Sequence, residues 1–192
     1  MRPRCGGKAT LIRFADDFVV LFQSEMDAQQ FAKALPKRLA KFNLTLAEER
    51  THLLPFGRKH WRSGQSHPHY FDFLGFRHHL GTDRKGRMAV VRIPSPKSVR
   101  KFLAEVKEWL QQHMHDRPQD QQAALTQKLQ GFYQYFSVWY ASEKLRVVWR
   151  EVYKLWKHAL EGRSQRGART WVRWTRHPWF TLPGPKLVHR TV

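Results

Sequence analysis

The chain has 192 residues, of which 41% are hydrophobic, so it can form one full domain or two small ones and is not a disordered tail. It carries 35 Lys and Arg against 15 Asp and Glu, and the net charge of +20 predicts a polyanionic partner. No segment approaches the roughly 20 consecutive apolar residues of a membrane span. We therefore expect no membrane partner, and the aromatic residues interleaved with Lys and Arg favour nucleic acid. Cys5 alone cannot form an internal disulfide, which predicts a reducing, cytoplasmic location.

Two adjacent acids, Asp16 and Asp17, interrupt the otherwise apolar and β-branched run of residues 11–22. This pattern predicts a strand, a tight turn and a second strand, with both carboxylates at the tip of the hairpin. Because neighbouring carboxylates repel each other, we expect a compensating cation, either an Arg of this basic chain or a hard divalent ion such as Mg²⁺ or Mn²⁺. The alternative is a solvated turn that only separates the two strands.

The next segment has the pattern of an amphipathic helix. Ser24 fits the N-cap position with Asp27 three residues later, and apolar residues then recur at helical spacing as far as Phe42. Pro36 lies inside this pattern. We expect it to kink the helix or to start a second short one, since proline lacks the backbone donor.

A second hairpin is predicted further along the chain. Residues 70–76 favour a short aromatic strand, and residues 88–93 favour a returning strand. The connection at residues 81–87 contains two glycines and fits a phosphate cradle, but its polar centre more often forms a hairpin turn. Strands and a helix in this order predict an α+β fold for residues 1–93.

From residue 94 the sequence is predominantly helical. Ser95 fits an N-cap and Pro96 the first helical position, and apolar stripes then continue through three helices, which predicts a bundle over residues 94–161. Residues 162–192 mix cations with tryptophans without a clear period. They form either a nucleic-acid-binding surface or a last helix whose tryptophans cap the bundle. The candidate nucleic-acid-binding residues are Lys97, Arg100, Lys101, Arg163, Arg166, Arg169, Trp171, Arg173, Trp174 and Arg176.

Four segments, in order, resemble those of the group II intron-type reverse transcriptases, also called maturases. F-A-D-D at residues 14–17 resembles polymerase motif C, usually written Y-A-D-D, and residues 44–51 resemble motif D, where E-K-T is frequent. F-D-F-L-G-F at residues 71–76 resembles the F-x-F-L-G-F primer grip, motif E. L-Q-G-F-Y-Q-Y-F at residues 129–136 resembles the L-x-G-W-x-x-Y-F signature of the thumb. Each segment is short, but the four together extend over most of the chain.

The resemblance implies an architecture as well as a family. It implies a partial polymerase palm with motifs C, D and E at residues 1–93, made of β-hairpins with a packed helix. An all-α thumb bundle would follow at residues 94–161, and a basic, Trp-rich extension of the thumb at residues 162–192.

The resemblance also implies an activity. The chain would be the C-terminal portion of an RNA-directed DNA polymerase, which performs template-directed nucleotidyl transfer with Mg²⁺ or Mn²⁺. Asp16 would be the main metal ligand and Asp17 a looser one, and both would be catalytic. The residues near the nucleotide or primer would be Phe14, Ala15, Arg50, Leu74 and Gly75.

Two residues depart from the family pattern. Phe14 lacks the hydroxyl of the usual Tyr, and Arg50 keeps the charge of the usual Lys but stays protonated, so it is a poor proton donor. The chain also begins shortly before Asp16. We therefore expect it to lack the fingers and the metal-binding aspartate of motif A, to bind metal weakly and to be inactive alone.

Two functional alternatives remain open from the sequence. In the first, the chain is one part of a polymerase, and its partners are template or intron RNA, an RNA–DNA duplex and, in a split enzyme, a separate fingers and palm chain. In the second, it is a non-catalytic, basic RNA-binding module that assists the folding and splicing of intron RNA.

Overall fold

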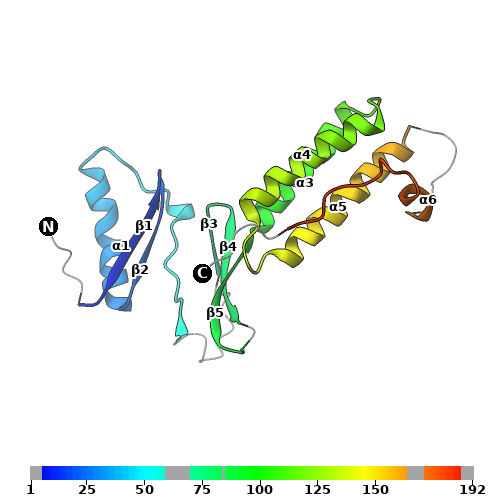
Figure 1. Ribbon diagram of the computed structural model, residues 1–192. Helices are drawn as coiled ribbons and strands as arrows, with labels where there is room; N and C mark the ends of the chain where they lie inside the picture. Colours follow the sequence, from blue (N-terminus) through cyan, green and yellow to red (C-terminus); the bar gives the residue numbers. More distant parts are fainter. Residues whose placement is uncertain (1–5, 59–69, 84, 164–170, 187–192) are drawn as a thin grey trace. The chain divides into compact units, whose positions relative to one another are not determined.

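The structure is a computed structural model that describes residues 6–58, 70–83, 85–163 and 171–186 (Figure 1). Among the described residues, helices account for 50% and strands for 19%, and the strands form two small antiparallel sheets. The predicted α+β class is therefore confirmed.

The chain divides into two compact units. Unit 1 holds residues 1–74 and 80–89, and unit 2 holds residues 75–79 and 90–192. In the described segments, no helix combines the length and the apolar character needed to cross a membrane.

The first hairpin of unit 1 forms as predicted. β1 (Ala9–Phe14) and β2 (Asp17–Phe22) pair in antiparallel register. Ala15 and Asp16 make the turn between them. Ala15 has a φ of 50°, a left-handed conformation that is uncommon for residues other than glycine. The chain thus accepts local strain to make a two-residue turn here.

Helix α1 (Glu25–Ala40) follows the hairpin. Its N-cap is Ser24, whose side chain accepts a hydrogen bond from the backbone N–H of Asp27, as predicted. One helix passes through Pro36, so the predicted start of a second short helix at this residue is wrong. The proline removes one backbone donor, and the remaining hydrogen bonds of the helix outweigh that loss.

Helix α1 packs on β2. The rings of Phe22 and Phe31 lie 5.3 Å apart between centroids, and Ala28 is the buried residue of the helix. The rest of the helix surface is more accessible, so α1 covers one side of the hairpin with a small contact.

Asp27 also holds the residues that precede β1. Its carboxylate accepts hydrogen bonds from the backbone N–H groups of Gly6, at 3.3 Å, and Gly7, at 3.1 Å. Next to them, Lys8 donates its backbone N–H to the side-chain oxygen of Gln23 at 3.2 Å. The start of β1 is therefore tied to the start of α1.

The second sheet has the order β3-β4-β5, with strands β3 (Tyr70–Phe73), β4 (Phe76–Thr82) and β5 (Met88–Pro94). The prediction of one strand from residue 70 to residue 76 is wrong, because Leu74 and Gly75 form a turn with φ values of 50° and 75°. Leucine seldom adopts a left-handed conformation, so only the glycine marks this turn in the sequence.

The connection from β4 to β5 is a turn organised by Asp83. Its carboxylate accepts hydrogen bonds from the backbone N–H groups of Lys85, at 2.8 Å, and Arg87, at 2.9 Å, and pairs with the Arg87 guanidinium at 2.7 Å. A carboxylate of the chain thus occupies the N–H groups that a phosphate cradle would offer, which supports the hairpin turn. The hydrogen bonds from Arg87 lower the pKa of Asp83 from its ordinary value.

Unit 2 contains the predicted helices. They are α3 (Pro96–Gln112), α4 (Pro118–Phe136) and α5 (Ser142–Glu161), as Figure 1 shows. Ser95 caps α3 by accepting a hydrogen bond from the backbone N–H of Ser98 at 3.1 Å, as predicted. Both α3 and α4 contact α5, so the three helices share one core.

A buried polar contact links the helices across this core. Trp156 of α5 is fully buried and donates from its indole nitrogen to the side-chain oxygen of Gln121 at 3.0 Å. The Gln121 amide nitrogen in turn donates to the backbone carbonyl of His113 at 2.6 Å. Further fully buried apolar side chains of the core are Leu125, Leu129, Ala141, Leu145, Val148 and Val152.

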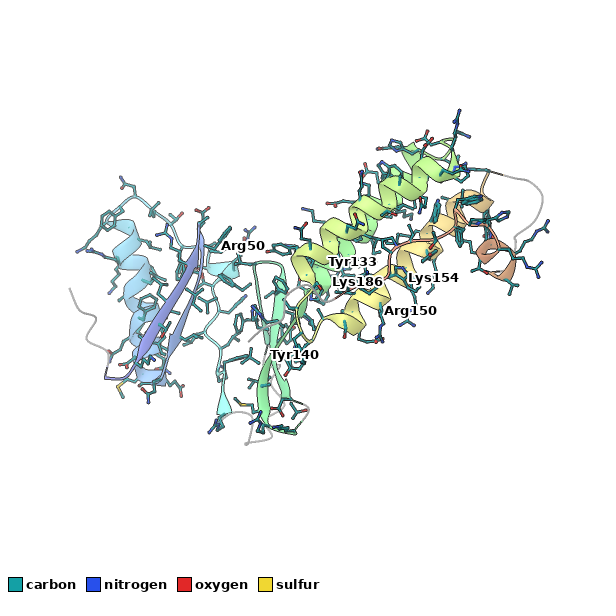
Figure 2. All side chains as sticks on the ribbon, viewed as in Figure 1. Arg50, Tyr133, Tyr140, Arg150, Lys154 and Lys186 are labelled. Atoms are coloured by element: carbon teal, nitrogen blue, oxygen red, sulfur yellow. The ribbon has the colours of Figure 1, made fainter. Side chains whose placement is uncertain are left out.

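Residues 176–186 pack on the bundle. Leu182 is buried, and its backbone N–H donates to the hydroxyl of Tyr153. The hydroxyl of the buried Ser137 donates to the backbone carbonyl of Lys186, which is labelled in Figure 2. This last described segment is therefore part of unit 2.

Leu145→Ala is expected to lower the free energy of unfolding by about 2–5 kcal/mol, because it removes buried surface and leaves a cavity. Val147→Ala on the same helix is the control, since Val147 is 39% exposed, and its effect should stay within about 0.5 kcal/mol. Urea unfolding followed by circular dichroism measures both. Equal losses would contradict the assignment of the buried face of α5.

Asp83 is expected to titrate below the ordinary aspartate pKa of about 3.9, and Arg87→Ala should move its pKa back toward that value. Because the folded-state pKa is lowered, the turn's contribution to stability is complete above the unfolded-state pKa and is lost as the pH falls through the folded-state pKa. Carboxyl chemical shifts followed by NMR over the acidic range give both pKa values. An ordinary pKa in the unmodified chain would contradict the hydrogen-bonded turn.

Candidate functional site

Asp16 and Asp17 lie at the tip of the first hairpin and are both exposed. Asp17 is the first residue of β2 and pairs with Phe14. Arg13 lies beside the turn, where its Nε donates to the backbone carbonyl of Ala15 at 2.7 Å. Within the described segments, neither aspartate forms an ion pair with a Lys or Arg. Of the two compensating cations considered, the arginine is therefore not found at this tip.

The register of the hairpin assigns its residues to two faces. The two residues of each cross-strand pair lie on the same face of the hairpin, and successive pairs alternate between the two faces. Phe22 packs on Phe31 of α1, so residues in step with Phe22 face the helix. The opposite face, called the open face below, consists of Thr10, Ile12, Phe14, Asp17, Val19 and Leu21.

The open face is apolar and accessible. Ile12 is 48% exposed, Phe14 is 64% exposed and Leu21 is 45% exposed. Among the residues that the structure describes, each strand of this two-stranded sheet also has an unpaired edge. Contiguous exposed apolar surface marks interaction sites, and Asp17 places one carboxylate on this same surface.

The two aspartates fit a hard divalent cation by donor type, since Mg²⁺ and Mn²⁺ prefer carboxylate oxygens. They do not form a complete ligand set. Among the residues that the structure describes, no group of three or more His, Cys, Asp or Glu side chains is placed to hold a metal ion. A full coordination shell at the tip would need ligands from water, a nucleotide or another polypeptide segment.

Arg50 lies in the short 3₁₀ helix η1 (Glu48–Arg50) and is exposed (Figure 2). Its guanidinium lies 4.0 Å from the carboxylate of Glu49, an exposed pair that contributes little stability. No hydrogen bond or ion pair in the described part of unit 1 joins Arg50 to the aspartates of the hairpin tip.

Gly75 is fixed by contacts with α3 and α4. Its carbonyl accepts hydrogen bonds from the backbone N–H of Ser95, at 2.9 Å, and from the hydroxyl of Ser98, at 3.0 Å. A Cβ atom at this position would lie 3.1 Å from Ser98 Oγ and 3.4 Å from Phe136 Cζ. Both the positive φ and the close packing therefore require glycine here. Leu74, the other residue of the turn, is half-buried.

Three candidate nucleic-acid-binding residues lie in the first turns of α3. Lys97, Arg100 and Lys101 are all exposed, and Lys101 lies 3.9 Å from Glu105. The first turn of the helix contains no acidic residue. These cations are therefore accessible to a polyanion.

The candidate residues after α5 behave differently from one another. Arg173 and Arg176 are exposed, whereas Arg163 is partly buried, and burial lowers its pKa. Two guanidinium nitrogens of Arg163, Nε and Nη2, have no hydrogen-bond partner among the described residues. Outside the described residues lie Arg166, Arg169 and the side chain of Trp171.

Trp174 belongs to helix α6 (Trp171–Thr175) and is only 5% exposed. Its indole nitrogen donates to Glu161 at 3.3 Å, and its ring lies 5.3 Å from that of Phe180. Trp174 therefore packs as part of the bundle, which is the second interpretation given above for this segment.

The structure also shows an aromatic pair that the sequence analysis did not single out. Tyr135 at the end of α4 stacks on Phe76 of β4, with ring centroids 5.5 Å apart and ring planes 28° apart. Phe136 contacts Phe76 from another side at 5.0 Å. In the sequence, Tyr135 lies beside the apolar stripe of α4 and not within it. An aromatic residue at such a position is expected to be exposed and not part of the core, and this is the signal that could have identified it.

The arrangement thus brings Phe14, Ala15, Asp16 and Asp17 into one turn and places Gly75 against the start of α3. No model of a known protein family matches the chain, and no curated protein matches it.

Gly75→Ala should destabilise the chain more than Gly86→Ala. The two glycines have nearly equal φ values, 75° and 73°, so the left-handed backbone costs alanine about 1–2 kcal/mol at both sites. Only Gly75 also has atoms within 4 Å of the added Cβ, and Gly86 has none. Thermal unfolding of both variants measures the difference. Equal shifts of the midpoint would contradict the close packing of Gly75 on Ser98 and Phe136.

Proposed function

We propose that the chain is the C-terminal portion of an RNA-directed DNA polymerase of the group II intron type, which takes part in template-directed nucleotidyl transfer. The observation that carries this proposal is the pair of exposed carboxylates, Asp16 and Asp17, at the tip of a hairpin with an apolar open face. The resemblance of four segments to the family, in the family's order, supports it.

In this proposal Asp16 and Asp17 hold a divalent ion, Mg²⁺ or Mn²⁺. When bound, such an ion neutralises charge that develops on a reacting phosphate. The two residues suit this task because they are accessible and are not neutralised by an ion pair in the described part of the chain. Phe14 lies beside Asp17 on the open face and offers an exposed ring next to the carboxylates.

The proposal includes a second polypeptide segment that covers the open face. Ile12, Phe14 and Leu21 are too exposed for a finished core, and a two-stranded hairpin is only marginally stable by itself. The segment would add apolar side chains over the face and contribute the further carboxylate of motif A. It belongs either to the same gene product or to a separate chain.

A second candidate function is favoured by one observation, the cluster of accessible cations Lys97, Arg100 and Lys101 in unit 2. Here the chain is a non-catalytic module that binds intron RNA and assists its folding and splicing. Binding would then fall with rising salt, because cation–phosphate contacts release counterions.

Primer extension distinguishes the two functions. The 192-residue chain is mixed with an RNA template, a DNA primer, dNTPs and Mg²⁺, with or without the polypeptide encoded by the adjacent upstream reading frame. We expect no extension by the chain alone and extension by the mixture. Asp16→Ala should reduce extension to background, because it removes the main metal ligand.

Glu25→Ala is the matched control, since Glu25 is an exposed carboxylate of unit 1 that lies in α1 and not at the hairpin tip. It should leave extension unchanged. Extension that survives Asp16→Ala would contradict the catalytic role of the hairpin. Extension by the chain alone that Asp16→Ala abolishes would contradict the need for a second segment.

A further inference from the structure

We propose that the stacked pair of Tyr135 and Phe76 is a platform for an unpaired base, so that unit 2 prefers single-stranded nucleic acid over other polyanions. The inference deepens the proposed function, since it rests on a nucleic-acid partner, but it does not require nucleotidyl transfer. Tyr135 is 54% exposed, although its ring stacks on that of Phe76 with the centroids 5.5 Å apart.

The platform is rigid because its supporting rings are themselves packed. Phe136 lies 5.0 Å from Phe76 and is buried, and its ring also lies 4.6 Å from that of Phe132 in the core. A ring held in this way loses little conformational entropy when a base stacks on it. Tyr135 therefore differs from an exposed aromatic residue on a loose segment.

Cations lie at the same end of the bundle as this platform. Gly75, the residue before Phe76, accepts a hydrogen bond from Ser98 in the first turn of α3, and Lys97 and Lys101 flank Ser98 along the helix. Within unit 2, the hydrogen bond between Gly75 and Ser98 thus connects the aromatic pair to the helix turn that carries the exposed cations. Phosphates of a strand whose base stacks on Tyr135 would have these cations nearby.

The position of the cations is itself unfavourable for folding. Positive side chains near a helix N-terminus oppose the helix dipole, and like charges at i and i+4, as in Lys97 and Lys101, repel each other. The first turn of α3 contains no acidic residue that would offset this cost, and Lys101 is paired only loosely, at 3.9 Å, with Glu105. A bound polyanion would remove the cost, which favours nucleic acid over an apolar protein partner.

The test compares single-stranded RNA with heparin, a polyanion that has no bases. The full chain is titrated, without metal ions or nucleotides, with an unstructured RNA 12-mer that contains 2-aminopurine and, separately, with heparin. Wild-type binding of the RNA should quench the fluorescence of the 2-aminopurine. Tyr135→Leu should weaken RNA binding about tenfold and reduce the quenching, because one base stack is lost. Its affinity for heparin should not change.

Two variants make the comparison specific. Tyr135→Phe keeps the ring and should bind RNA like the wild type. Phe42→Leu removes the ring of a unit 1 residue that is 61% exposed, and it should leave RNA binding unchanged. Thermal unfolding of each variant checks that unit 2 remains folded.

The proposal is overturned if Tyr135→Leu binds RNA as tightly as the wild type. It is also overturned if Tyr135→Leu lowers the affinity of the chain for RNA and for heparin equally. The ring would then act through the fold or the charge of the protein and not by stacking on a base. Because no primer, nucleotide or metal ion takes part, a failed primer-extension assay leaves this result unaffected. The two proposals can therefore fail separately.

Discussion

The hydrogen bond between Trp156 and Gln121 is the interaction on which the helical unit depends. Both side chains are fully buried, so an unpaired amide or indole here would cost the full desolvation of a polar group. The second hydrogen bond of Gln121, to the carbonyl of His113, extends this link to the connection between α3 and α4. One amide thereby fixes α4 against α5 and against the end of α3. The surfaces at the other end of the bundle, including Tyr135, depend on this alignment.

Unit 1 has no comparable interior in the residues that the structure describes. Helix α1 buries Ala28 alone, and all six residues of β1 are exposed. Hydrophobic burial scales with the apolar area removed from water, so a hairpin with one open face and a lightly packed helix gains little from it. Under the proposed function, further chain that covers the face would add the missing burial. The same exposure keeps Asp16 and Asp17 hydrated, which is why two adjacent carboxylates are tolerated at one tip.

Periodic and local signals were sufficient to predict much of the fold, because each depends on neighbours in the sequence. The cap at Ser95 and the apolar stripes of α3, α4 and α5 are examples. The turn at Leu74 was not predictable, because leucine seldom adopts a left-handed backbone, and the contact that fixes the turn, from Ser98 of α3 to the carbonyl of Gly75, joins residues far apart in the sequence. The burial of Trp174 was left open, because its segment has no apolar period. For the candidate site, turn chemistry predicted the position of Asp16, but the open face required the strand register. If the pairing of a strand shifted by one residue, the side chains of its two faces would change places.

Under the proposed function, covering the open face and binding a cation are linked. A polypeptide that lies over Ile12 and Phe14 removes water from the side of the hairpin that carries Asp17. Loss of water strengthens the repulsion between the two carboxylates and raises the free energy of leaving them without a counter-charge. The covered state therefore binds a divalent ion more tightly than the open state. By thermodynamic reciprocity the ion also favours the covered state, so the site would assemble its polypeptide and its metal together.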